Sequence, residues 1–267
     1  MRPTMRAAAL AATALLALTA CSSSGDDAAA DAAGELTLVN PGTLTVCTNP
    51  PFEPFEFEDE NGEIVGLDID ITREVADDLG VDLEVVVTPF DTLESGASLT
   101  TDACDILASG LTITDERAEK FDFSEPYFDA DQGLLVAAGS GITGVDGLAG
   151  KTVAVQQATT GETWAEENGL SVVQFEELGL QIKALETGQV DAVVNDIAVL
   201  GPYAAGDLEV AATFPTGEQY GIGVKTGNTA LLDAINATLD RIREDGTYDA
   251  IYTARIGTAP STAAAEG

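Results

Sequence analysis

Short apolar runs alternate along the chain with segments of helical periodicity. The strand-like runs occupy residues 44–47, 81–87, 106–108, 132–136, 150–155, 191–196 and 219–224. Ile71, Val75 and Leu79 fall on one helical face, and Gly80 follows as a stop signal. Residues 180–185 and a segment from about residue 229 to Gly246 also fit helices. Strands that alternate with helices predict βαβ units and parallel sheets, with ligand-binding groups on the loops beyond the strand carboxyl ends.

Several residues suited to binding a small molecule follow directly after these predicted strands. They are Asn49, Phe52, Phe90, Ser109 and Thr112. A different pattern precedes the second strand, because residues 55–58 alternate Phe-Glu-Phe-Glu before an Asn-Gly turn, which predicts a hairpin. The spacing therefore predicts one pocket where the strand ends converge.

The stretch from residue 105 to 128 carries the most specific chemistry. Small residues at Ser109 and Gly110 allow a ligand to approach the backbone, and Thr112 adds a hydroxyl donor. Arg117 follows as a planar cation suited to a carboxylate, in a chain with only 11 Lys and Arg against 46 Asp and Glu. On local chemistry alone, a salt bridge between Arg117 and an acidic neighbour explains the arginine equally well.

The run Ser-Gly-Leu-Thr-Ile-Thr-Asp-Glu-Arg at residues 109–117, followed by Phe-Ser-Glu-Pro-Tyr at 123–127, resembles a known signature. It is similar to that of the family-3 solute-binding proteins, which capture amino acids for ABC importers, and further family blocks follow in order from about residue 43 to 257. The resemblance implies that Arg117, with Thr112, holds the α-carboxylate of an amino acid.

A second set of candidates follows the strand at residues 150–155. Thr159 is placed to cap a helix, and free N–H groups at a helix start favour an anion, although capping alone also explains a threonine there. The resemblance implies that Thr160 binds the carboxylate, but Ala158 stands where the family usually has glycine. It also implies that Asp196, at the end of a strand, receives the α-ammonium, helped by a main-chain carbonyl near Gly110.

The rest of the expected pocket would surround the amino-acid side chain. Phe52 and Phe90 would form apolar walls, while Asn49 and Gln156 would contact the side-chain tip. Because both tip residues are amides and Glu53 is expected to point outward, a polar uncharged amino acid such as glutamine is favoured, with a basic one next. The expected ligand-binding set is Asn49, Phe52, Phe90, Ser109, Gly110, Thr112, Arg117, Gln156, Thr159, Thr160 and Asp196.

The resemblance implies an α/β architecture of the two-lobe periplasmic-binding-protein type (type II), in which each lobe is a sheet flanked by helices and two crossover strands form a hinge. The expected divisions are a first lobe at 36–130, a second lobe at 131–218, and a return segment with C-terminal helices at 219–257. The crossings are expected near residues 130–132 and 215–219. The ends, 21–35 and 258–267, are expected to be a flexible tether and a frayed tail.

Residues 1–20 have the features of a signal peptide. Arg2 and Arg6 precede a mostly apolar run that is too short to span a bilayer, and the run ends in Leu-Thr-Ala before Cys21. That ending resembles a bacterial lipobox, although a small residue before a cysteine is also common by chance. We expect Cys21 to be lipidated and to anchor a monomer at the outer face of the cytoplasmic membrane, beside an ABC transporter permease.

The composition of the chain argues against several other classes of function. The formal net charge of −35 disfavours binding to nucleic acid and to anionic headgroups, and the absence of histidine excludes His-containing catalytic and metal sites. No cofactor, metal or catalytic residue is expected. Two alternatives remain, a cyclohexadienyl-dehydratase-like enzyme on the same fold and a sensor-type ligand-binding domain.

The two cysteines other than Cys21 leave one covalent question open. Cys47 and Cys104 suit a disulfide in an exported protein. If they sit at opposite ends of neighbouring parallel strands, however, the offset would exceed the ~7 Å limit between Cα atoms. The sequence does not decide between these.

Overall fold

Two five-stranded sheets make up the scaffold in the computed structural model, which describes residues 36–257. Cys21, the signal segment and both expected tails lie outside that range. The first sheet has the order β4-β1-β5-β12-β6, and β1 runs parallel to both β4 and β5. Its strands are β1 (Thr43–Thr48), β4 (Asp82–Val87), β5 (Ile106–Leu107), β6 (Asp122–Phe123) and β12 (Gly223–Val224).

The second sheet has the order β11-β7-β10-β8-β9. Strand β8 is parallel to β9 and β10, whereas the long strand β7 pairs antiparallel with β10 and β11. Its strands are β7 (Phe128–Ala137), β8 (Thr152–Gln156), β9 (Ser171–Phe175), β10 (Ala192–Asp196) and β11 (Leu208–Tyr220). A small hairpin joins β2 (Phe57–Glu58) to β3 (Ile64–Val65).

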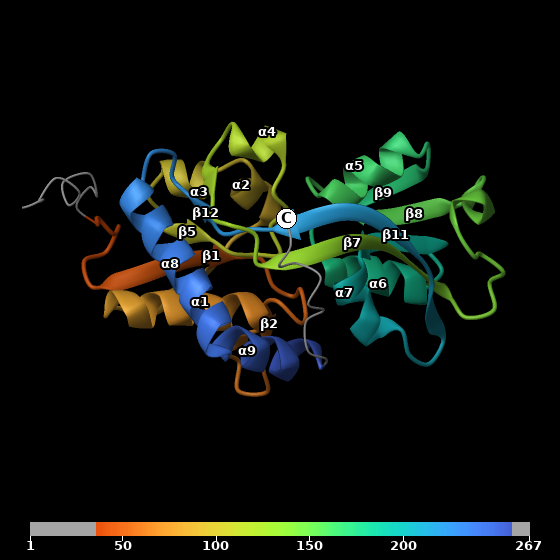
Figure 1. The fold of residues 1–267 in the computed structure, drawn as a ribbon. Coiled ribbons are helices and arrows are strands. Elements are labelled where there is room, and N and C mark those ends of the chain that lie inside the picture. The colour runs from red at the N-terminus through yellow and green to blue at the C-terminus, as the bar shows by residue number, and fades with distance from the viewer. Residues whose placement is uncertain (1–35, 258–267) are drawn as a thin grey trace, which may run out of the picture. The chain divides into compact units, whose positions relative to one another are not determined.

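Helices cover both faces of each sheet (Figure 1). In the first half, α1 (Leu67–Leu79) packs with α8 (Thr229–Asp245) and α9 (Thr247–Ile256), while α2 (Phe90–Glu94) and α3 (Ala97–Thr100) lie on the other face. In the second half, α5 (Thr160–Glu167) lies opposite α6 (Leu178–Glu186) and α7 (Ile197–Leu200). The remaining short elements are α4 (Asp115–Ala118) and the 3₁₀ turns Val145–Leu148 and Gly201–Tyr203. None of the helices between residues 36 and 257 is long and apolar enough to cross a membrane.

The alternation of side chains along the strands explains why both faces are covered. Val46 and Ile106 point into the core shared with α1 and α8, whereas the next residues, Cys47 and Leu107, point into the core shared with α2. Fully buried parallel strands need apolar residues on both faces, which is why their sequences read as continuous apolar runs. The α/β prediction with two helix-flanked sheets is confirmed.

The structure differs from the sequence prediction at β9, β11 and β12. Strand β9 and most of β11 were not anticipated, and the single strand expected at 219–224 is interrupted after Tyr220. β7 and β11 pair with each other, and their register is irregular between Phe214 and Glu218. Long edge strands that carry polar residues at alternate positions give a weaker signal than buried parallel strands.

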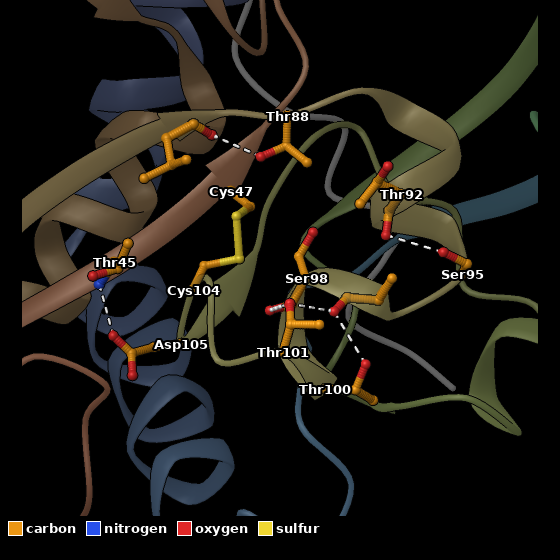
Figure 2. Close-up of a disulfide and its surroundings, with 12 residues drawn as sticks. Thr45, Cys47, Thr88, Thr92, Ser95, Ser98, Thr100, Thr101, Cys104 and Asp105 are labelled. Atoms are coloured by element: carbon orange, nitrogen blue, oxygen red, sulfur yellow. Dashed lines mark hydrogen bonds between the residues drawn. A yellow bond between two sulfur atoms is a disulfide. The ribbon is translucent and has the colours of Figure 1, made fainter.

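A disulfide joins Cys47 to Cys104, with a Cα–Cα separation of 5.8 Å (Figure 2). Cys104 is not part of the neighbouring strand, because β5 begins only at Ile106 and residues 101–104 form a turn after α3. The turn brings Cys104 back over the sheet face that Cys47 also faces, where Leu107 and Phe90 belong to the same core cluster. The strand offset considered for the sequence therefore does not apply.

We predict that the double substitution Cys47→Ala/Cys104→Ala lowers the free energy of unfolding by about 4 kcal/mol, the chain-entropy expectation for a separation of 57 residues. Urea unfolding of wild type and variant measures the difference. A reducing agent should destabilise the wild type and leave the double variant unchanged. Equal stability of the wild type with and without reductant would contradict the bond.

Candidate functional site

One pocket collects polar and aromatic side chains from the strand ends of both sheets. All eleven ligand-binding residues expected from the sequence line it, and Glu56 and Asn195 line it as well. The convergence follows from topology, since the carboxyl ends of β1, β5, β8 and β10 carry most of these residues. Whether they bind a ligand remains a prediction.

Arg117 is the only buried cation among residues 36–257 and is 4% exposed. Short helix α4 positions it, because the Thr114 side chain caps the helix by accepting the Arg117 backbone N–H. The guanidinium donates to the carbonyl oxygens of Thr112 and Ala158, each at 3.0 Å, and lies 5.4 Å above the Phe90 ring. No carboxylate lies within ion-pair distance of it in the described part of the chain, so the salt-bridge alternative for Arg117 finds no partner.

The loop after β8 faces Arg117. Thr159 caps α5, since its hydroxyl accepts the Glu162 N–H, and the same hydroxyl donates to the Gln156 carbonyl at 2.7 Å. Ala158 adopts a left-handed conformation with φ 64°, the region that glycine occupies most easily. The loop thus keeps the glycine-like shape despite the alanine, and the Ala158 carbonyl is the one that Arg117 reaches.

The ends of β1 and β5 are joined through Ser109. The Asn49 N–H donates to the Ser109 hydroxyl at 3.0 Å, and that hydroxyl donates to Glu56 Oε1 at 2.6 Å. Gly110 follows with φ 50°, and a Cβ there would lie 2.5 Å from the Phe52 ring. Only glycine allows the backbone to pass this close to an aromatic wall of the pocket.

Asp196 sits at the end of β10 and is 7% exposed. Its two oxygens accept hydrogen bonds from Gln132 and from the Tyr220 hydroxyl. Burial raises the pKa of Asp196 to about 7, and the nearby Glu218 carboxylate adds to the rise. Because both partners are neutral, the negative charge of Asp196 is hydrogen-bonded but not neutralised.

Glu56 is fully buried although it is a carboxylic acid. The turn at 52–56 folds against the start of α1, where a Cβ on Gly66 would lie 2.0 Å from the Phe55 carbonyl oxygen. Glu56 Oε1 accepts from Ser109, while Oε2 has no hydrogen-bond partner. Burial, and then repulsion from Asp68, raises the pKa of Glu56 well above its usual range.

Direct contacts cross the pocket between the two sheets. Gln156 donates to the Asn49 side chain at 3.0 Å, and the hydroxyls of Thr112 and Thr160 lie 3.4 Å apart. These contacts bridge the pocket from the residues of one sheet to those of the other. A wider groove adjoins the pocket at Arg117 and Thr160, and the only tryptophan of the chain, Trp164, lies on it.

The sequence profile of the bacterial extracellular solute-binding proteins, family 3, matches residues 44–258. The chain belongs to this family. A probable histidine-binding protein from Neisseria gonorrhoeae is 37% identical over 257 residues, which cover 92% of each chain. The ABC transporter glutamine-binding protein GlnH from Bacillus subtilis is 36% identical over 198 residues, covering 72% of each.

Solved structures of a similar protein carry two different ligands. An ancestral arginine-binding protein bound to arginine has a TM-score of 0.76 and 39% identity, covering 80% of this chain and 98% of that one. An ancestral arginine-binding protein bound to glutamine has a TM-score of 0.77 and 38% identity, covering 81% of this chain and 99% of that one. These two-lobe neighbours confirm the expected fold class of this solute-binding protein.

Sequence reasoning missed Glu56 and Asn195. The Phe-Glu-Phe-Glu alternation at residues 55–58 predicts a strand, but β2 contains only Phe57 and Glu58, and residues 52–56 form a turn. Asn195 lies inside β10, where its side chain accepts the Asp196 N–H at 2.8 Å. No periodicity distinguishes Glu56, which is buried, from Glu53, which is exposed.

We predict that Asp196→Asn stabilises this solute-binding protein, free of ligand, increasingly as pH rises. The raised pKa means that ionising Asp196 costs more in the folded than in the unfolded chain, so its stabilising contribution is complete below about pH 4 and is lost through about pH 7. The Tyr220 hydroxyl can accept as well as donate, so it can partner the amide. The difference in unfolding free energy should grow by up to about 4 kcal/mol between pH 4 and 8.

Chemical denaturation of both proteins across this pH range measures the effect. The substitution Asp240→Asn, at a surface residue whose side chain is 64% exposed, serves as the control for the loss of one negative charge. A difference that is independent of pH, or one equal to that of the control, would contradict a buried ionisable Asp196.

Proposed function

We propose that this solute-binding protein binds an amino acid with a cationic side chain, arginine first, and delivers it to an ABC importer. The observation that carries the proposal is that Glu56 lines the pocket and that its Oε2 atom is buried without a hydrogen-bond partner. A buried carboxylate is costly unless it is paired, and a guanidinium or ammonium group is the ligand chemistry that pairs it.

The other end of the pocket supports recognition of the α-carboxylate and α-ammonium groups that all amino acids share. Arg117 lies beside the hydroxyls of Thr112 and Thr160, a donor set suited to an α-carboxylate. Asp196 is the remaining buried carboxylate of the lining and suits an α-ammonium. We therefore assign Arg117 and Asp196 to the zwitterion and Glu56 to the side chain.

The amino-acid preference differs from the one expected from the sequence. Asn49 and Gln156 favoured a neutral amide, but their side chains are hydrogen-bonded to each other. Glu53 is exposed, as expected, and Glu56 brings the acidic group into the pocket instead. The ancestral relative that is described with arginine and with glutamine bound supports a pocket of this kind.

We further propose that binding is coupled to closure of two lobes, at 36–130 and 131–218, about the paired strands β7 and β11. The contacts between Asn49 and Gln156 and between Arg117 and Ala158 belong to the closed form. A permease that recognises only this form would receive loaded protein. The curated relatives carry the names of binding proteins, which supports a binding role over catalysis.

We predict that, in a thermal-shift screen of the twenty amino acids, arginine raises the melting temperature most. A ligand at one hundred times its Kd adds about 2.7 kcal/mol to the stability of the folded state. Arginine recovered from the complex should be chemically unchanged by mass spectrometry. Stabilisation by glutamine alone would overturn the assignment of Glu56, and a changed product would favour the enzyme alternative.

The variant Arg117→Ala should weaken binding of arginine by at least about 30-fold, because a charge-assisted hydrogen bond to the α-carboxylate is lost. Circular dichroism verifies that the variant is folded. Arg73→Ala removes an exposed arginine on α1 and should leave the affinity unchanged. Normal affinity in the Arg117 variant would remove this residue from the site.

Anchoring is a separate part of the proposal and concerns residues outside the described range. We propose that Cys21 is lipidated after removal of residues 1–20, so that the protein stays at the outer face of the cytoplasmic membrane as a tethered monomer. Cys21→Ala should therefore move the protein from the membrane fraction to the soluble extracytoplasmic fraction. Fractionation followed by immunoblotting measures this, and unchanged membrane retention would count against lipidation.

A further inference from the structure

The Glu56 carboxyl group has an asymmetric environment. Its Oε1 atom accepts a hydrogen bond from the Ser109 hydroxyl at 2.6 Å, whereas its Oε2 atom is buried without a hydrogen-bond partner, and the residue lines the pocket. A carboxylate with one free oxygen can accept further N–H groups, whereas a protonated carboxyl can donate its own hydrogen at that position. The chemistry that Glu56 offers to a ligand therefore depends on one proton.

The charged groups around Glu56 favour keeping that proton. Asp68 of α1 is buried nearby, with one oxygen accepting the Gly110 N–H and the other the Tyr127 hydroxyl, both at 2.7 Å. Burial raises the pKa of Asp68 to about 6, so above that pH it carries a charge that repels a second one on Glu56. The pocket wall opposite carries Asp196, a third carboxyl group.

Among residues 36–257, no cation lies within ion-pair distance of Glu56. Arg117 lines the same pocket, but its guanidinium is bonded to the Thr112 and Ala158 carbonyls. Tyr127 is neutral and already donates to Asp68. Burial and the neighbouring Asp68 therefore both hold the pKa of Glu56 high until a cation enters.

We infer that the protonation of Glu56 selects between two classes of side chain, because the site releases a proton when it takes a cationic amino acid and keeps the proton when it takes a neutral one. This rests on the function proposed above. With arginine, the Oε2–H bond breaks, the proton passes to solvent, and the carboxylate accepts guanidinium N–H groups. With a neutral urea or amide, the intact Oε2–H group donates to the ligand carbonyl oxygen.

Arginine and citrulline form a matched pair for the test, because citrulline replaces the guanidinium by an uncharged urea of nearly the same shape. Isothermal titration calorimetry at one pH in two buffers of different ionisation enthalpy gives the number of protons released by each ligand. Any proton released from Asp196 to accommodate the α-ammonium is common to both ligands and cancels in the difference. Arginine should release up to one proton more than citrulline.

The affinities should change with pH in opposite directions. As pH falls below the pKa of Glu56 in the ligand-free site, the ratio of arginine to citrulline affinity should drop by about tenfold per pH unit. Glu56→Gln should remove the difference in proton release and the pH dependence of the ratio, and it should favour citrulline. The control Glu53→Gln changes the exposed glutamate three residues earlier. It should leave the difference in proton release and the pH dependence of the affinity ratio as in the wild type.

The two proposals fail in different ways. If arginine binds tightly but releases the same number of protons as citrulline at every pH, Glu56 is not the switch and the arginine assignment stands. If citrulline does not bind at any pH, the proposed switch is also wrong, because a protonated Glu56 carboxyl should donate a hydrogen bond to the urea carbonyl oxygen. If arginine does not bind to the wild type, the proposed function itself is wrong. The wild-type measurements decide these outcomes even if Glu56→Gln does not fold.

Discussion

The burial of negative charge beside one cleft is the constraint on which the rest of this site depends. Glu56, Asp68 and Asp196 are each at most 7% exposed, and none forms an ion pair with another described residue. A buried carboxylate without a counter-ion destabilises the fold, so the scaffold must supply hydrogen bonds instead. Much of the local architecture consists of such donors: the Gly110 N–H and the hydroxyls of Ser109, Tyr127 and Tyr220.

The sheet topology explains why these donors can be held in place. Parallel strands β1 and β5 end side by side, so the loops that follow them bring Asn49 and Ser109 within one hydrogen bond of each other. The disulfide ties β1 to the turn before β5 and packs against the cluster that contains Phe90, the ring beneath Arg117. The first sheet therefore positions Arg117, Glu56 and Asp68, while Asp196 comes from the end of β10 in the second sheet.

Most of the strand-end residues could be predicted from the sequence because burial on both faces of a parallel sheet leaves a strong apolar signal. Asn49, Phe90 and Ser109 follow from that signal, whereas Asp196 was singled out by the family resemblance. Glu56 could not, since its position depends on a turn whose backbone folds onto Gly66, a contact that no periodicity records. The disulfide was undecidable for a similar reason: the two-residue length of β5 places Cys104 in a turn.

The same charges decide what can drive closure. Neutral contacts across the pocket, such as Gln156 to Asn49, contribute only about 1 kcal/mol each after the loss of water. A shift of a closure equilibrium from mostly open to mostly closed needs about 5.5 kcal/mol of differential binding. In the proposed binding mode, a bound zwitterion would pair with Arg117 and Asp196 and a side-chain cation with Glu56. Each hydrogen bond to a charged group would contribute about 1.5–3 kcal/mol, more than a neutral contact. A ligand that leaves Glu56 protonated would form no ion pair there, so in the proposed binding mode the charge at the side-chain tip sets selectivity and closure together.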